Sequence, residues 1–315
     1  MDGTPDERVQ INAAKTFQED LAWLAETMVN QVFTEGTQRG GWSIFVSQDI
    51  SVMLKYALSI YRLLFYINAD AHRAEPEWRT DYGVTGMSLV RSLIDCLYNV
   101  TAILGNPDEA GAAYRKSGFK KVLKDLDEDQ QRYGGQPKWD AYIAERRKIV
   151  DFQIRQCGLT LDEVRKQEPW LTLGAYLSQL QPGGVLNPHQ RFLKTFTYLG
   201  WRQYSALSHG AFEAFAGTLG DMPVGSYYAE QLLPQEMRPK IQESYGNFLS
   251  VHIARAATVL LCLITELQAY CRFLGHRINE RICKIWVDLM PMFETKELYD
   301  ARYEKLMAER GISPA

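Results

Sequence analysis

The sequence predicts an all-α fold, a multi-helix bundle with long buried central helices. Apolar residues recur every three or four positions over most of the chain, the spacing of one helix face. No stretch alternates apolar and polar residues for long enough to build a sheet, and no internal repeat occurs. The 315 residues, 46% of them hydrophobic, are enough to bury a sizeable core. We therefore expect a single all-α domain over residues 1–315.

Three helices are expected before residue 105. An amphipathic helix over residues 6–35 has apolar residues at helical spacing: Phe17, Leu21, Leu24 and Met28. Residues 44–67 are apolar almost all round, but Lys55 and Arg62 interrupt them. Membrane spans rarely tolerate two such charges at mid-depth, so we interpret this segment as a buried central helix. A third helix is expected over residues 84–104.

The middle of the chain begins with a clear helix start and then becomes more charged. Asn106 can cap a helix in which Pro107 takes the first position and acidic residues follow. A glycine- and proline-containing turn then leads into a charged helix over residues 139–157. Thr160 and Glu163 have the spacing of a capping box. We expect residues 134–187 to form a charged helical elaboration on the core.

The last third of the chain is also expected to be helical. A helix over residues 188–209 ends before Gly210, which can adopt the left-handed conformation of a helix terminus. Residues 235–275 form a long helix that is strongly apolar from Phe248 onward. Two further helices are predicted over residues 280–289 and 294–310, the last of them polar.

Composition narrows the class of protein. The net charge of -3 gives no global attraction to nucleic acid or to an anionic membrane. The five cysteines are dispersed without a CxxC pair, which is typical of reduced thiols in the cytosol. The acidic, polar start of the chain is no signal peptide. We expect a cytoplasmic protein without a membrane span.

Familiar catalytic and ligand-binding motifs are absent from the sequence. It has no P-loop, no GxGxxG after a strand, no HExxH and no GxSxG. The five histidines are scattered, and no two of them have the i, i+3 or i, i+4 spacing of helical metal ligands. We therefore expect neither a metal nor a cofactor.

Polar residues on helices that should be buried form the candidate site. Arg91 and Asp95 are four apart and can pair on one helix face. Arg202 and His209 are seven apart, so on a helix they point within about 20° of each other and lie roughly 10 Å apart. Ser205 shares their face.

A third polar stripe lies on the late apolar helix, where Glu266 shares a face with His252, Arg255 and Tyr270. Burying such charges without partners costs several kcal/mol, so the three stripes are expected to meet inside the bundle. Two interpretations remain open. The cluster is either an ion-pair network that fixes helix register, or a cleft whose arginines hold a small anionic or phosphate-bearing ligand.

Three motifs together resemble a bacterial family of unknown function, domain family 5677. They are Arg91-Ser-Leu-Ile-Asp95, Asn106-Pro107 with Ala110 and Tyr114, and Tyr204-Ser205-Ala-Leu-Ser208-His209-Gly210. The resemblance covers roughly residues 44–275 and implies a bacterial helical bundle without an assigned activity. Asp95 stands where a glutamate is expected, which keeps the charge but shortens its reach. Tyr204 and Ser205 join the candidate binding residues.

The pair Arg202-x6-His209 is similar to the Arg-x(4 to 6)-His motif of HEPN-type helical ribonucleases of toxin and phage-defence systems. That resemblance implies metal-independent cleavage of RNA across a homodimer. His209 would act as general acid or base, and Arg202 would stabilise the transition state. Gln203 departs from the residue most typical after that arginine. The two functional hypotheses are therefore a protein that binds a small anion and an endoribonuclease.

Overall fold

The computed structural model describes residues 18–39, 41–71, 76–179, 186, 190–191, 193–194, 238–271, 276–291 and 293–312. Within these ranges the chain is helical and contains no strand, so the all-α prediction is confirmed. The helices are α2 (Gln18–Arg39), α3 (Ile44–Ala71), α4 (Pro76–Gly105), α5 (Pro107–Tyr133), α6 (Pro137–Gln156), α7 (Leu161–Lys166), α8 (Leu173–Ser178), α13 (Arg238–Cys271), α14 (His276–Leu289), α15 (Phe293–Leu298), the π-helix η2 (Tyr299–Tyr303) and α16 (Glu304–Arg310).

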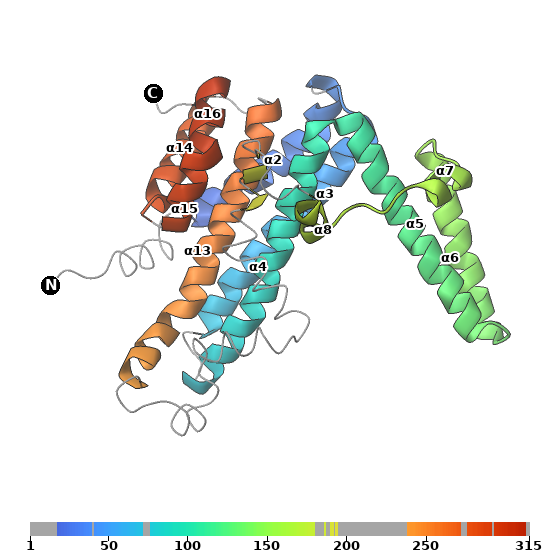
Figure 1. Ribbon diagram of the computed structural model, residues 1–315, viewed down its shortest axis with the longest axis horizontal. Coiled ribbons are helices and arrows are strands. Elements are labelled where there is room, and N and C mark those ends of the chain that lie inside the picture. Colours follow the sequence, from blue (N-terminus) through green and yellow to red (C-terminus); the bar gives the residue numbers. More distant parts are fainter. Residues whose placement is uncertain are drawn as a thin grey trace.

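Four long helices, α2, α3, α4 and α13, pack side by side into the main bundle (Figure 1). The centre of this bundle is α13, which contacts all three of the others. From Ile253 to Ile264 almost every side chain of α13 is buried, including that of Cys262. A helix that is apolar on all sides needs neighbours on all sides, which explains its central place.

Only one side of α3 is buried, contrary to the expectation of a fully buried helix over residues 44–67. Val52 and Tyr66 are 59% and 71% exposed. Stretches of α3, α4 and α13 are each long and apolar enough to cross a membrane: Ile44–Ile67, Gly86–Gly105 and His252–Cys271. The absence of a membrane span thus stays a prediction, as does the cytoplasmic location.

The C-terminal helices pack against the end of α13. Trp286 of α14 donates its indole N–H to Thr265 of α13 at 3.0 Å, and its ring stacks on Tyr303 with centroids 4.8 Å apart. The predicted polar helix over residues 294–310 is in fact three segments, α15, η2 and α16. Their buried residues, among them Thr295 and Met307, attach the chain end to the bundle.

Three helices, α5, α6 and α7, form an arm that extends away from the bundle (Figure 1). Asn106 takes the N-cap position of α5, but its side chain bonds to Glu109 and not to the backbone. The capping box of Thr160 and Glu163 is present at the start of α7. The arm has its own small core, made of Leu123, Leu126, Ile143, Val150, Ile154 and Val164. This core includes two residues of α5, which precede the elaboration expected from residue 134.

Candidate functional site

The predicted polar residues of α4 form an ion pair. The Nε atom of Arg91 lies 3.8 Å from Oδ2 of Asp95, one helical turn away, and both side chains are partly exposed. The spacing-based expectation for this pair is therefore confirmed. Four other candidates, Arg202, Tyr204, Ser205 and His209, lie outside the described residues, so their meeting with α4 stays a prediction.

Glu266 of α13 is buried and bound by an arginine that the sequence analysis did not select. Arg302 of η2 donates from Nε and from Nη2 to the two carboxylate oxygens of Glu266, the second bond being 2.8 Å long. Burial by itself would lower the pKa of Arg302. The hydrogen bonds from Arg302 to Glu266 and the negative charge of Glu266 outweigh this effect, so the pKa of Arg302 is raised. The bidentate pair holds the chain end against α13.

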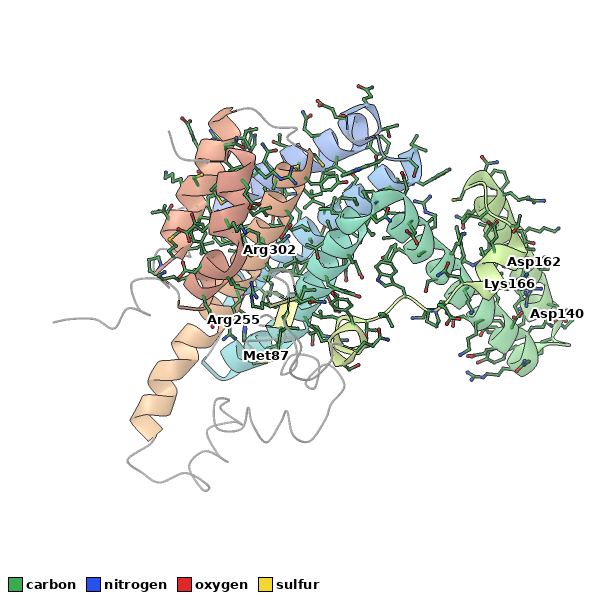
Figure 2. All side chains as sticks on the ribbon, turned by 45° about the horizontal axis from the view of Figure 1, so that its top comes forward. Met87, Asp140, Asp162, Lys166, Arg255 and Arg302 are labelled. Atoms are coloured by element: carbon green, nitrogen blue, oxygen red, sulfur yellow. The ribbon has the colours of Figure 1, made fainter. Side chains whose placement is uncertain are left out.

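Arg302 was missed because it lies on a π-helical turn. In η2 the repeat is wider than in an α-helix, so the three- and four-residue spacing used to assign faces does not apply there. The buried residues Leu298 and Tyr303 are five apart. That spacing is the one sequence signal that would have indicated a shifted face. Figure 2 shows Arg302 within the bundle, far from the arm residues Asp140 and Asp162.

His252, on the same helix as Glu266, is 1% exposed. Burial, and next the nearby charge of Arg255, lower the pKa of His252 to about 3. The imidazole is therefore neutral at pH 7. Tyr270, the last member of the predicted stripe, is instead 40% exposed.

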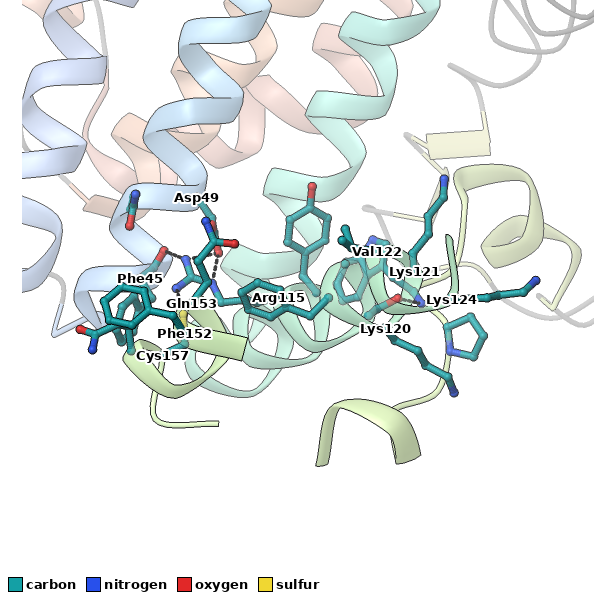
Figure 3. Close-up of a pocket in the computed structure, with 18 residues that line it drawn as sticks. Phe45, Asp49, Arg115, Lys120, Lys121, Val122, Lys124, Phe152, Gln153 and Cys157 are labelled. Atoms are coloured by element: carbon teal, nitrogen blue, oxygen red, sulfur yellow. Dashed lines mark hydrogen bonds and ion pairs between the residues drawn. The ribbon is translucent and has the colours of Figure 1, made fainter. Parts of the chain in front are cut away.

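A cavity of about 970 Å³ lies between the start of α3, the middle of α5 and the end of α6 (Figure 3). We call it the arm cavity. Its lining comes from three helices and from the segment after α7, and consists of Phe45, Gln48, Asp49, Tyr114, Arg115, Ser117, Gly118, Phe119, Lys120, Lys121, Val122, Lys124, Phe152, Gln153, Gln156, Cys157, Pro169 and Trp170. Such a volume suits a ligand of drug or nucleotide size.

A close helix crossing places α5 against α3 at the edge of the arm cavity. A Cβ atom on Gly111 would lie 2.5 Å from Cγ2 of Val46, so glycine is what allows this approach. Arg115 lies one turn after Gly111 on α5, and Asp49 lies one turn after Val46 on α3. The crossing therefore brings these two side chains together.

Arg115 joins three elements at the cavity wall. Its Nε donates to Oδ2 of Asp49 at 3.0 Å, its Nη2 to the carbonyl of Phe45, and its Nη1 to the sulfur of Cys157 at 3.3 Å. Its guanidinium also lies 4.7 Å from the centre of the Phe45 ring. Burial raises the pKa of Asp49, while the bond and charge of Arg115 oppose that rise. With its donors so engaged, Arg115 anchors the arm to the bundle.

The segment after α7 closes the cavity on another side. The backbone N–H of Trp170 donates to Ser117 at 2.7 Å, and its indole N–H donates to Asn99 of α4 at 2.9 Å. The Trp170 ring meets Tyr114 edge-on, with centroids 5.3 Å apart. Trp170 thus packs against α4 and α5, and at the same time it forms a cavity wall.

Three lysines of α5 give the arm cavity a positive charge. Lys120 donates to the carbonyl of Gln167 at 2.7 Å, while Lys121 and Lys124 are exposed. Lys124 lies 3.5 Å from Glu128 in an exposed pair, which is worth little in water. Asp49, the one carboxylate among the described lining residues, is neutralised by Arg115. An anion is therefore the ligand that this lining favours.

The sequence shows these lysines and aromatic residues on α5 but gives no reason to select them. They become a site only because α3 and α6 pack beside them, and the partners Asp49 and Cys157 are 66 and 42 residues away from Arg115. Among the described residues, no group of three or more His, Cys, Asp or Glu side chains has the arrangement of a metal site.

Comparisons with protein-family models, with curated proteins and with solved structures returned no match. Function is therefore inferred from the geometry and charge of this chain alone.

Proposed function

We propose that this protein binds a small phosphate-bearing anion in the arm cavity. One observation carries the proposal: three lysines of one helix belong to the lining of a large cavity whose carboxylate is already neutralised. Lysine ammonium groups are common phosphate ligands, and a partly enclosed site strengthens their attraction.

Binding is favoured over acid–base catalysis at this position. The described lining contains no histidine, and Asp49 is held by Arg115. The groups left to a ligand are ammonium donors, amides and aromatic rings. These groups bind and orient a ligand. The anion-binding role predicted for the cluster of Arg91, Arg202 and His209 stays a separate prediction, while Glu266 and Arg302 serve the packing of the chain end.

The proposal is tested by isothermal titration calorimetry with pyrophosphate at low ionic strength. Wild-type protein should bind, and the double variant Lys121→Gln/Lys124→Gln should bind about tenfold more weakly, since two exposed charges are removed. The matched control is Lys138→Gln/Lys148→Gln, which removes two exposed charges from α6 outside the cavity. Equal losses in both variants would mean that only net charge matters, and no binding by wild type would refute the proposal.

The ribonuclease hypothesis rests on Arg202 and His209 and is tested separately. Purified protein is incubated with RNA in EDTA, and cleavage that is lost in His209→Ala at an unchanged melting temperature supports the enzyme. A homodimer would be required for two such pairs to share one groove. Wild-type protein that leaves RNA intact contradicts this hypothesis and has no bearing on the arm cavity.

A further inference from the structure

The two ends of the arm cavity differ in chemistry, and the difference identifies a class of ligand. Figure 3 shows Lys120, Lys121 and Lys124 at one end and Phe45, Phe152 and Gln153 at the other. Both ends belong to one continuous cavity. A ligand that fills it must therefore be anionic at one end and suited to aromatic rings and amides at the other.

The second end has the groups that recognise a planar heteroaromatic ring. Phe152 is 57% exposed although it is a large apolar side chain, so its ring is open to stacking. Gln48, Gln153 and Gln156 belong to the same lining and are exposed. Each glutamine amide offers both a donor and an acceptor, the combination needed to pair with the edge of a nucleobase.

The separation of the two ends fits one nucleotide. Along α5, Arg115 lies at the aromatic end, and Lys121 and Lys124 follow it by six and nine residues. At 1.5 Å per residue these lysines lie about 9 and 14 Å further along the helix. That span is on the order of the length of a nucleotide from base to phosphate. A bare phosphate would leave the aromatic end unused.

We infer that the ligand of the arm cavity is a free nucleotide, with its base at Phe152 and the glutamines and its phosphate at the lysines. This inference rests on the proposed phosphate-binding function and extends it. The stacking of a base on an exposed phenylalanine strengthens binding by about tenfold or more. The nucleotide should therefore bind well above the affinity of its sugar phosphate alone.

The experiment compares pyrophosphate, ribose 5-phosphate and the four ribonucleoside 5′-monophosphates by calorimetry. At least one nucleotide should bind about tenfold more tightly than ribose 5-phosphate. In Phe152→Ala that advantage should disappear while pyrophosphate affinity stays unchanged. The control variant Ile149→Ala, an exposed apolar residue one turn away on α6 that does not line the cavity, should behave as wild type.

The outcomes separate the two proposals. Pyrophosphate binding with no advantage for any nucleotide, or an advantage that survives Phe152→Ala, overturns the nucleotide inference and leaves phosphate binding standing. A complete lack of binding by pyrophosphate and by nucleotides overturns both. A ribohexanucleotide that binds far more tightly than any single nucleotide also overturns the inference, because the site would then belong to a nucleic-acid strand.

Discussion

At the scale of single residues, buried charged and titratable groups control stability. Glu266 is buried and Arg302 is half-buried, and the two side chains satisfy each other with two hydrogen bonds. His252 lies on the same helix and is buried in its neutral form. A buried pair keeps its charge because each partner compensates the other, whereas a buried histidine whose nearest charge is an arginine favours the neutral ring.

His252 makes the protein less stable as the pH falls. Its pKa is lowered in the folded state, so below about pH 6.5 the unfolded chain binds a proton that the folded protein does not. The contribution of His252 to stability is therefore fully present above that pH. It is lost as the pH falls toward the pKa of His252 in the folded protein. Between pH 7 and pH 5 this loss is about 2 kcal/mol.

Urea denaturation at pH 7 and pH 5 measures this effect. Between pH 7 and pH 5 the free energy of unfolding of the wild-type protein should fall by about 2 kcal/mol more than that of His252→Gln, because glutamine cannot take up the proton. All other titrating groups are shared by the two proteins, so the difference isolates His252. The same pH dependence in both proteins would show that the ring is not buried in the neutral form.

At the scale of elements, the crossing of α3 and α5 determines whether the arm cavity exists. The close approach of Gly111 to Val46 brings Arg115 within reach of Asp49, Phe45 and Cys157. Widening this crossing would separate the wall made by α3 from the wall made by α5.

Gly111→Ala tests this crossing. Alanine favours the helix by about 1 kcal/mol, but its methyl group would clash with Val46, which is buried and stiff. We expect a net loss of about 1–2 kcal/mol in the free energy of unfolding. Gly118→Ala on the same helix has open space around the added carbon and should stabilise the protein instead. If both substitutions changed the free energy of unfolding in the same direction, this account would be contradicted.

At the scale of the whole molecule, the bundle and the arm have separate cores of unequal size. The main core draws on α2, α3, α4, α13 and the C-terminal helices, whereas the arm core has six buried residues. Apolar area removed from water is the main stabilising contribution, so the arm is the less stable unit.

Native-state hydrogen exchange should reveal this inequality. Amides of Ile143 and Ile154 in α6 should open at a lower free energy than amides of Leu260 and Ile264 in α13. A nucleotide bound in the arm cavity should raise the opening free energy of α6, because it contacts both α5 and α6. Equal opening free energies in α6 and α13 would show that arm and bundle unfold as one unit.

Much of the helical architecture follows from local patterns in the sequence. The proline after Asn106, the capping box at Thr160 and the apolar run of α13 mark starts and faces that depend on neighbours three or four residues away. The Arg91–Asp95 pair is predictable for the same reason, since one helical turn fixes its separation.

The site depended on contacts between distant parts of the chain. Asp49 meets Arg115, and Glu266 meets Arg302, across 66 and 36 residues. The exposed side of α3 could not be read from its composition, because its apolar residues look alike whether a neighbouring helix covers them or not. Periodicity reports which residues share a helix face, but only packing decides what that face meets. Thus the sequence alone determined the helices, and the tertiary structure alone decided where a cavity forms between them.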